Sequence, residues 1–377
     1  MSVEIREIRP TRSEVLKFVH YPIDVLYKDS PYYVPTIVND EVDLFLPEKN
    51  PAFDFCESKY FMAYRDGKPV GRVAAIINSL VNKREDRNEC RFGYVDFIDD
   101  EEVVDALFNA VVQWAKEKGM EYLTGPLGFT DMDKEGMLVE GFDQLPTQSE
   151  IYNYEYYPRQ MERMGFEKDV DWLGLRITVP NEVPEKMARV AKLVSNRFKV
   201  RNIHFTSRQK LVDSYGDAIF KLINEAYDKI FGYSPLSERQ IRHYIKVYLP
   251  FLPLDHISLV VDEKEELIAV GITIPSISKA LQKCRGRFLP FGWYHMLRSM
   301  NGGTDIVDLL LIAVKPEYQN RGVNSLLFTD LIPVYIKRKY KWAESNMELE
   351  TNDKVLQQWS YFTVNQNKRR RAYIKKI

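Results

Sequence analysis

One segment of the sequence, Leu309 to Leu327, orders its residue types in a way that could bind an anion. It begins with the apolar run Leu-Leu-Leu-Ile-Ala-Val, continues through a polar loop that contains Gly322, and enters an amphipathic helix at Val323. The first N–H groups of a helix have no partner within it, and the helix dipole adds about half a positive charge there. Because Gly322 permits close approach of the backbone, the segment predicts a pyrophosphate site.

Other phosphate or metal sites lack support in the sequence. It contains neither G-x-x-x-x-G-K-[ST] nor G-x-G-x-x-G, the loops typical of nucleoside triphosphate and dinucleotide sites. The three cysteines form no C-x-x-C pair, which argues against a disulfide framework and a thiolate zinc site. The five histidines show no H-x-x-x-H spacing, so we predict no metal site.

The loop resembles the signature of the GNAT superfamily of acyl-CoA-dependent N-acyltransferases. That signature is a strand, then Val-x-Pro-x-Tyr, then [QR]-x-x-G-x-[GA] at the start of a helix; this sequence has Val-Lys-Pro-Glu-Tyr at 314–318 and Gln-Asn-Arg-Gly-Val-Asn at 319–324. Asn324 departs from the pattern, because the family usually has Gly or Ala there. The resemblance implies acetyl-CoA or another acyl-CoA as co-substrate and no metal. It places the pyrophosphate on Gln319, Asn320, Arg321, Gly322, Val323, Asn324 and Ser325.

The resemblance also implies positions for the rest of the cofactor site. In GNAT enzymes the strand before the loop splays from its neighbour, and its free amides bind the thioester oxygen and the pantetheine arm; these would be Leu311, Ile312 and Val314. Asn352 resembles the asparagine near the CoA arm, although a cap for the following helix explains it equally well. Tyr361 stands where the superfamily often has the tyrosine that protonates the leaving thiolate. A core aromatic beside Trp359 and Phe362 is the alternative.

Acyl transfer to an amine also needs a route for the amine proton. Asp308 on the strand, and Glu348 and Glu350 at the end of the next one, are candidates for a base that acts directly or through water. Each could equally be an exposed strand residue. Our predicted catalytic set is Tyr361, Asp308 and Glu350.

The order of elements that must position this loop occurs twice in the chain. The first half has β-rich runs at 60–64 and 70–77 around an Asp-Gly turn, a strand at 93–98 and a helix at 101–118. The second half has a hairpin at 257–261 and 267–275, a strand at 306–314, a helix at 323–337, a strand at 342–349, a helix at 354–362 and a strand at 370–374. We therefore predict an α/β fold with a mixed sheet in two copies. With the resemblance, these become tandem GNAT-like domains at 1–179 and 199–377, joined by a linker helix at 180–198.

The two copies are not equivalent as sites. The corresponding junction of the first half, Asp96 to Glu102, has no glycine and carries acidic residues around the helix start. Those acids suit the helix dipole but would repel a pyrophosphate. We expect the first domain to lack the CoA loop and to supply a wall, an interface or part of the acceptor pocket, or merely to stabilise the second domain.

About thirty residues separate the hairpin strand that ends near Pro275 from the strand that begins at Ile306. A connection of this length is more often functional than idle. It mixes basic residues with aromatic ones, which could accept an acidic or aromatic acceptor, or RNA. A solvated helix with an apolar underside explains the same residues, and we prefer it.

Composition limits the remaining functions. Hydrophobic residues make up 45% of the chain and charged residues 28%, the balance of a globular protein. The formal net charge of -1 gives no global field for a polyanion, which argues against a nucleic-acid partner. No apolar run approaches about 18 residues, so we expect a cytoplasmic protein without a membrane partner. The predicted function is acyl-CoA-dependent N-acyltransfer, with acetyl transfer to a small-molecule or peptide amine as the first expectation. A non-catalytic acyl-CoA-binding or sensor protein and an aminoacyl-tRNA-dependent transferase remain alternatives, and the oligomeric state stays open.

Overall fold

The computed structural model describes residues 2–352 and 358–377, and packing divides the chain into two units. Unit 1 comprises Met1–Leu173, Ser278–Met296 and Asn367–Ile377, and unit 2 comprises Gly174–Ile277 and Leu297–Gln366. The sequence predicted contiguous domains at 1–179 and 199–377. The division differs because the chain end pairs with a unit 1 strand, Tyr373 opposite Gly125, a long-range pairing with no local signal.

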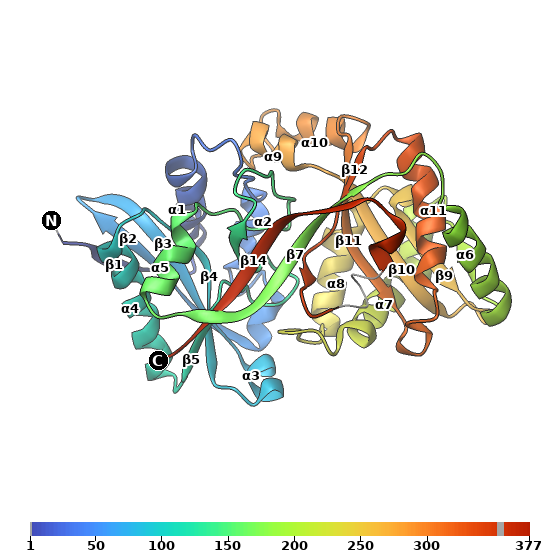
Figure 1. Ribbon diagram of the computed structural model, residues 1–377. Helices are drawn as coiled ribbons and strands as arrows, with labels where there is room; N and C mark the ends of the chain where they lie inside the picture. Colours follow the sequence, from blue (N-terminus) through green and yellow to red (C-terminus); the bar gives the residue numbers. More distant parts are fainter. Residues whose placement is uncertain (1, 353–357) are drawn as a thin grey trace. The chain divides into compact units, whose positions relative to one another are not determined.

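The sheet of unit 1 has the strand order β1-β2-β3-β4-β5-β14, and β6 also pairs with β14 (Figure 1). The strands are β1 (Glu4–Ile8), β2 (Cys56–Arg65), β3 (Lys68–Asn78), β4 (Glu89–Phe97), β5 (Tyr122–Gly125), β6 (Met137–Glu140) and β14 (Val364–Lys376). Strands β2 and β3 form the predicted hairpin, and both turn residues, Asp66 and Gly67, have positive φ (53° and 75°).

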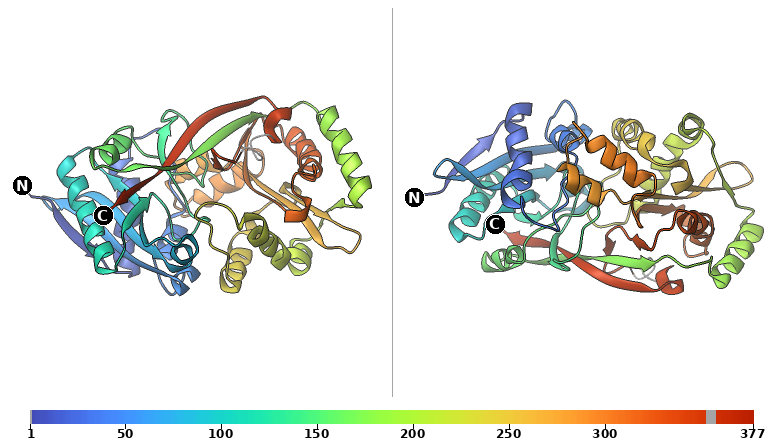
Figure 2. Two further views of the ribbon diagram at one scale, coloured as in Figure 1. Left: turned by 60° about the horizontal axis from the view of Figure 1, so that its bottom comes forward. Right: turned by 90° about the horizontal axis from the view of Figure 1, so that it is seen from above.

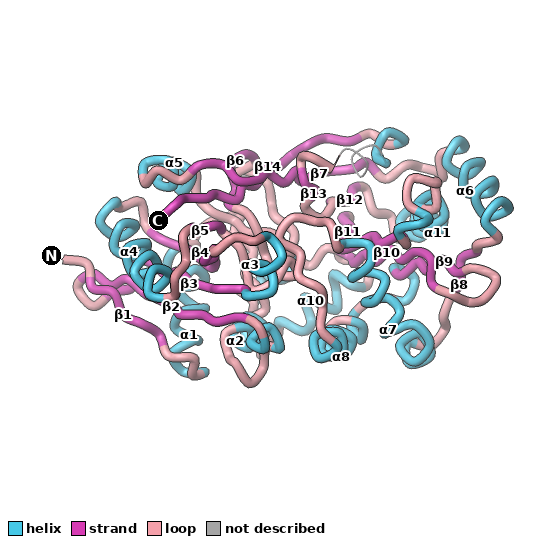
Figure 3. Tube along the Cα trace, turned by 90° about the horizontal axis from the view of Figure 1, so that it is seen from below, coloured by secondary structure: helices cyan, strands magenta, loops and turns pink. Residues whose placement is uncertain are grey.

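Helices cover both faces of this sheet (Figure 3). They are α1 (Arg12–Tyr21), α2 (Val38–Leu44), α3 (Ser79–Glu85), α4 (Glu101–Glu117) and α5 (Tyr156–Arg163). Residues of α1 and α2 pack into one core, and residues of α4 and α5 pack into another. The apolar residues of α4 between Val103 and Ala115 follow a helical spacing, and most of them are buried on one face of the predicted helix.

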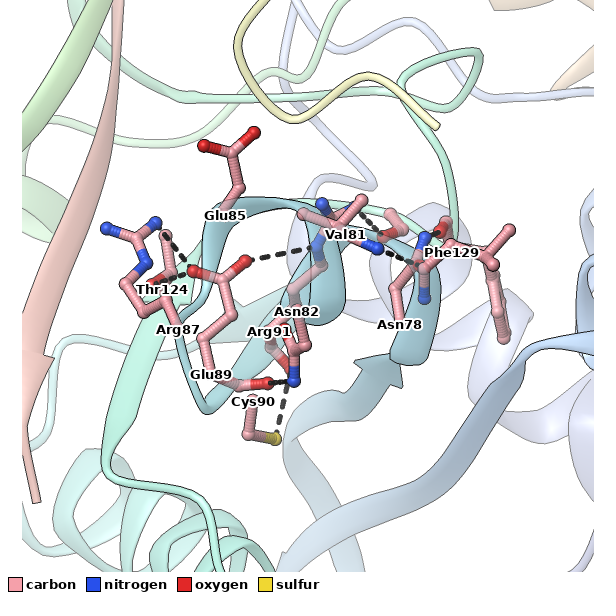
Figure 4. Close-up of polar contacts among 12 residues, drawn as sticks. Asn78, Val81, Asn82, Glu85, Arg87, Glu89, Cys90, Arg91, Thr124 and Phe129 are labelled. Carbon is pink, nitrogen blue, oxygen red and sulfur yellow. Dashed lines mark hydrogen bonds and ion pairs between the residues drawn. The ribbon is translucent and has the colours of Figure 1, made fainter. Parts of the chain in front are cut away.

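A buried polar cluster links the start of β4 to β5 (Figure 4). Glu89, 2% exposed, forms ion pairs with Arg87 at 2.6 Å and Arg91 at 3.6 Å. Thr124 on β5 donates its hydroxyl to the same carboxylate at 3.1 Å. Because a buried charge is tolerated only when it is paired and hydrogen-bonded, this cluster joins the two strands where their ladder begins.

In unit 2 the strand order is β7-β12-β11-β10-β9-β8 (Figures 1 and 2). The strands are β7 (Glu167–Thr178), β8 (Arg201–Ile203), β9 (Ile257–Val261), β10 (Leu267–Pro275), β11 (Ile306–Val314), β12 (Trp342–Glu344) and β13 (Glu348–Leu349). The residues of β7 before Gly174 belong to unit 1. The predicted bounds of β9, β10 and β11 agree with those observed.

Two pairs of helices flank this sheet. The helices of the second half are α6 (Glu185–Phe198), α7 (Arg208–Tyr227), α8 (Glu238–Val247), α9 (Ser278–Cys284), α10 (Gly292–Met300) and α11 (Asn324–Lys337). Helices α7 and α8 pack on one face, and α6 and α11 lie side by side on the other. The segment predicted as a linker helix is therefore an integral layer of unit 2. Of the helices within the described ranges, none has the length and apolarity to cross a bilayer.

Candidate functional site

Strand β11 separates from its parallel neighbour after its third residue. It pairs with β12 only through Ile306, Val307 and Asp308, and none of the described residues 309–314 continues that ladder. On its other edge β11 stays paired with β10 as far as Val314, with a one-residue bulge at Leu310. One edge of the strand from 310 to 314 is therefore open to donors and acceptors other than those of the sheet.

The direction of the backbone groups decides which residues serve this open edge. The Lys315 N–H donates to Ile268 O at 2.9 Å, toward β10. Because N–H and C=O groups alternate along a strand, those of Leu311 also face β10, whereas those of Ile312 and Val314 face the open edge. Of the three amides predicted for pantetheine and the thioester oxygen, the geometry directs two to the open edge and turns Leu311 away.

Protein side chains already occupy the carbonyl groups on the open edge. Tyr227 donates its hydroxyl to Ile312 O at 3.0 Å, and Gln319 donates its side-chain amide to Val314 O at 3.0 Å. Asn346 does the same for Leu310 O at 3.0 Å. Among the described residues, the N–H groups of Ile312 and Val314 have no acceptor, so the edge is a row of donors suited to carbonyl oxygens.

The loop after β11 alternates left-handed and right-handed backbone. Asn320 and Gly322 have positive φ (58° and 79°), and Val323 is right-handed (φ −61°, ψ −32°). Such alternation turns successive N–H groups toward one side and forms an anion-binding concavity. Within the described part of the chain, the N–H groups of residues 320–324 donate to nothing, and the first bond of the turn is Ser325 N–H to Gly322 O at 3.0 Å. With the dipole of α11 behind them, these donors can hold two phosphate groups.

The packing of the loop against α6 requires glycine at position 322 even without a ligand. A Cβ at this position would lie 3.0 Å from Val190 Cγ1 and 3.3 Å from Val194 Cγ2, both on α6. Its positive φ adds a penalty for any other residue. Substitution of Gly322 would therefore disturb the loop itself and could not isolate phosphate binding.

The side chains of the loop contact the protein around it. The Arg321 guanidinium lies 5.5 Å from the centre of the Phe198 ring, and Asn324 Nδ2 lies 3.5 Å from Gln358 Oε1. Ser325 donates its hydroxyl to Gly322 O at 2.6 Å. The unusual Asn324 is thus directed toward Gln358, so its amide need not crowd the N–H groups of the loop.

Unit 1 has the same strand geometry but fills it with its own side chains. Strand β4 pairs with β5 only from Glu89 to Arg91 and carries a bulge before Asp96. The Phe97 N–H donates to Tyr157 Oη at 3.0 Å, and Tyr156 donates its hydroxyl to Phe97 O at 2.6 Å. The Phe97 and Tyr157 rings stack at 4.1 Å. The edge that is open in unit 2 is closed in unit 1.

The helix start in unit 1 is likewise occupied. Asp100 accepts from the Val103 N–H at 3.2 Å and is paired with both terminal nitrogens of Arg65, at 2.6 and 3.0 Å. A carboxylate therefore stands where unit 2 offers free N–H groups. That an anionic ligand would be repelled here stays a prediction, which rests on the negative charge of Asp100 at the helix start.

Changing Tyr157 to phenylalanine is expected to destabilise the fold without weakening CoA binding. The Tyr157 side chain is 1% exposed, and its hydroxyl also lies 2.8 Å from the Tyr27 hydroxyl. Its loss leaves the Phe97 N–H buried without its partner, at a cost of about 1–3 kcal/mol. Thermal unfolding and calorimetry with CoA measure the two effects; weakened CoA affinity in a folded variant would place a ligand at unit 1.

The carboxylates near β11 differ in their surroundings. Asp308 is 2% exposed, and Glu344, its neighbour in the ladder, is ion-paired with Arg176 Nε at 2.5 Å. Glu350 is partly buried. Glu348 accepts from the Trp359 indole N–H through both oxygens, at 2.8 and 3.0 Å, and burial raises its pKa to about 7. A carboxyl that titrates near neutral pH suits proton transfer, so Glu348 is the stronger candidate for a base.

The remaining predicted residues lie at the end of this segment. Tyr361 ends a short 3-10 turn, Trp359–Tyr361, and is 37% exposed, which excludes a core role; Trp359, 5% exposed, is the core aromatic. Lys186 Nζ lies 5.5 Å from the Tyr361 ring centre. The Asn352 N–H donates to Leu349 O at 2.9 Å. Residues 354–357 of the helix predicted at 354–362 lie outside the described residues, and the described part that follows contains the 3-10 turn.

The described residues contain no arrangement of side chains that could bind a metal ion. No group of three or more histidine, cysteine, aspartate or glutamate side chains among them is placed to hold a metal ion. The donors gathered at the end of β11 are backbone N–H groups, which bind anions and carbonyl oxygens.

Comparisons with known proteins agree with this architecture. No family model matches the chain. It is 26% identical over 376 residues to Protein YghO of Escherichia coli K12, covering 97% of this chain and 94% of that protein. It is also 26% identical over 320 residues to a protein named bacterial ceramide synthase of Caulobacter vibrioides, covering 82% of this chain and 80% of that protein.

Solved structures similar to this one are GNAT proteins. A tandem GNAT protein from the clavulanic acid biosynthesis pathway matches with a TM-score of 0.58 at 11% identity, covering 100% of this chain and 98% of that one. A GCN5-related N-acetyltransferase from Sphaerobacter thermophilus matches with a TM-score of 0.51 at 12% identity, covering 99% and 95%. The chain therefore has a tandem GNAT fold, and the predicted fold class is confirmed.

Proposed function

We propose that the chain is an acyl-CoA-dependent N-acyltransferase whose CoA site lies in unit 2. One observation carries the proposal: free N–H groups line the open edge of β11 at Ile312 and Val314, and continue into the loop at 320–324. The loop suits a pyrophosphate and the strand edge suits the amide and thioester carbonyls of a pantetheine arm. A single stretch of backbone thus matches consecutive parts of one ligand.

The residues around this edge have distinct roles in the proposed reaction. The carboxylate of Glu348 accepts a proton from the attacking amine, directly or through a water molecule. The N–H group of Ile312 or Val314 donates to the thioester oxygen as negative charge develops on it. As the new C–N bond replaces the C–S bond, the Tyr361 hydroxyl gives its proton to the leaving sulfur. Asp308 and Glu350 are the alternative bases.

The acceptor is the part of the reaction for which a relative gives a clue. A ceramide is the N-acyl amide of a long-chain amino alcohol, and the Caulobacter relative carries the name of a ceramide synthase. We propose a long-chain amine as acceptor here, rather than the small-molecule or peptide amine expected from the sequence. The donor would then be an acyl-CoA, and the length of its acyl chain is determined by comparing acyl-CoA donors in the assay below.

Product analysis tests this function. The full chain is incubated with acetyl-CoA or palmitoyl-CoA and either sphinganine or a lysine-containing peptide; released thiol and amide products are then measured. Amide formation on sphinganine supports the proposal, and formation only on the peptide contradicts the acceptor class. CoA binding without any product would favour an acyl-CoA sensor, and transfer only from aminoacyl-tRNA would favour the third alternative.

A charge added to the loop is expected to weaken CoA binding. Changing Asn324 to aspartate keeps the side-chain shape but places a negative charge at the start of α11, within the loop proposed to bind the pyrophosphate. We expect one CoA per chain, with a dissociation constant on the order of micromolar, and a loss of affinity of roughly tenfold or more in the variant. Calorimetry measures both.

Asn109→Asp is the matched control, because Asn109 is exposed on α4 in unit 1 and receives the same charge. Its CoA affinity should equal that of the wild type. Equal weakening in both variants, or none in Asn324→Asp, would contradict the assignment of the loop.

A further inference from the structure

The loop between α9 and α10, together with the first turn of α10, presents large apolar side chains to solvent. Its exposed members, here called the apolar patch, are Phe288 (37% exposed), Leu289 (79%), Phe291 (69%), Trp293 (47%) and Tyr294 (51%). The sequence predicted a helix with these residues underneath. The structure has the opposite orientation, because Gly292 faces inward and a Cβ there would lie 1.9 Å from Arg287 O. Only glycine fits at that contact, so the bulky neighbours face outward.

The base of this segment is held firmly within unit 1. Gln282 donates to Pro31 O at 2.8 Å, and the Val38 N–H donates to Gly286 O at 3.0 Å. Arg285 donates to Ile23 O at 2.8 Å, and Arg287 is paired with Asp24 at 2.7 Å. The patch is thus displayed on a fixed base.

The patch carries few polar groups of its own. The Trp293 indole N–H donates to Pro290 O at 3.0 Å, inside the segment, so the ring needs no water at its nitrogen. Pro290 has no N–H group. Several adjacent exposed apolar side chains on one short segment differ from the single exposed residues that are normal on a protein surface.

The charged residues of the segment that carries the patch are all positive. Residues 276–304 contain five lysines and arginines and no aspartate or glutamate, in a chain of net charge -1. Arg285 and Arg287 are engaged by Asp24. Lys279 and Lys283, one turn apart on α9, are exposed, and neither has an ion pair with any described residue. An anionic surface would complement them.

We propose that the apolar patch docks on the surface of a lipid bilayer that contains anionic lipids. Leu289, Phe291 and Trp293 would enter the boundary between headgroups and acyl chains, and Lys279 and Lys283 would contact anionic headgroups. Aromatic and leucine side chains next to lysines are the composition of interfacial membrane contacts. An RNA fits less well, because its bases stack on aromatic rings and the most exposed member of the patch is a leucine.

Vesicle sedimentation of the full chain tests the docking, without CoA or any acceptor. We expect the protein to sediment with vesicles of phosphatidylcholine and phosphatidylglycerol, and less so as salt is added. Leu289→Glu should lower the partition coefficient by roughly tenfold or more, since it removes an inserted side chain and adds a repelled charge. Leu193→Glu is the matched control, because Leu193 on α6 is 69% exposed. Its partition coefficient should stay at the wild-type value.

A second variant tests the charged part of the surface. Lys279→Gln combined with Lys283→Gln should lower binding to the anionic vesicles by roughly tenfold and leave binding to pure phosphatidylcholine unchanged. No sedimentation of the wild type, or equal loss in Leu193→Glu, would overturn the proposal. So would a change from dimer to monomer in Leu289→Glu without any vesicle binding, because the patch would then join two copies of the chain. These results are independent of the acyltransferase, whose CoA affinity is measured separately on the same variants.

Discussion

Replacing Glu348 by glutamine is expected to lower turnover by about 10²–10⁴ while leaving CoA affinity intact. The glutamine keeps an oxygen for the Trp359 indole N–H, which lies 2.8 Å from Oε1 in the wild type, and keeps the side-chain volume. What it loses is the ability to accept the amine proton. Turnover is measured under saturating acyl-CoA and acceptor, and CoA affinity by calorimetry on the same preparation.

The pH dependence of the wild type follows from the same carboxyl. Burial raises the pKa of Glu348 to about 7, and a base acts only in its ionised form. Wild-type activity should therefore rise with pH and level off above about 7. The residual activity of Glu348→Gln should lack this rise. A wild-type rate that is flat from pH 5 to 8 would contradict this role.

The same pKa makes a prediction about stability, with a definite sign. In the unfolded chain a glutamate loses its proton near its ordinary pKa of 4.5, whereas in the folded chain burial raises the pKa of Glu348 to about 7. Between those values the unfolded state binds fewer protons, so the free energy of unfolding falls as pH rises through this window. Glu348→Gln removes that loss, and the variant should melt at a higher temperature than the wild type at pH 8.

Glu344→Gln supplies the contrast for this stability measurement. Glu344 is 3% exposed and already ion-paired with Arg176, so neutralising it weakens a buried pair and should lower the melting temperature. If both variants melt lower than the wild type at pH 8, Glu348 is a structural carboxylate. If Glu348→Gln melts higher but turns over normally, Asp308 or Glu350 takes the proton.

Local patterns were sufficient to predict most elements around the site. The hairpin and β11 alternate or run apolar between turn signals, and the loop that follows carries its glycine where φ is positive. The first ten residues of α7, Arg208 to Asp217, are mostly polar in sequence and become helical by packing Leu211 and Tyr215 into the core. The exchange of the chain end into unit 1 depends on long-range pairing that no local pattern encodes.

The candidate site was predicted less completely, for a related reason. The loop at 319–324 has a sequence signature, whereas the environment of a carboxyl depends on which distant side chain covers it. Glu348 was named with Glu350 as a possible base, but only the structure shows that Trp359, eleven residues later, encloses it. For Leu311, the strand register places its N–H toward β10, and a bulge at Leu310 sets that register.

The second large effect on turnover is expected at Tyr361, because its phenol is exposed and its hydroxyl is not hydrogen-bonded to any described residue. Its side chain is 37% exposed, and its hydroxyl makes no hydrogen bond to any described residue, although Lys186 Nζ lies 5.5 Å from the ring centre. Tyr361→Phe keeps the ring and its contact with the lysine and removes only the hydroxyl. The cost in folding should therefore be small, in contrast to Tyr157→Phe, which leaves a buried N–H without its partner.

If the Tyr361 hydroxyl protonates the leaving thiolate, Tyr361→Phe should lower turnover by about 10²–10⁴ with unchanged CoA affinity and melting temperature. The size of the effect should depend on the leaving group, because a more acidic thiol needs less help from a proton donor. An acyl thioester of an aromatic thiol, offered in place of acyl-CoA, should therefore narrow the gap between variant and wild type. Tyr157→Phe should show the reverse behaviour, a lower melting temperature with a normal rate per folded molecule. An unchanged rate in Tyr361→Phe would leave the thiolate to be protonated by solvent.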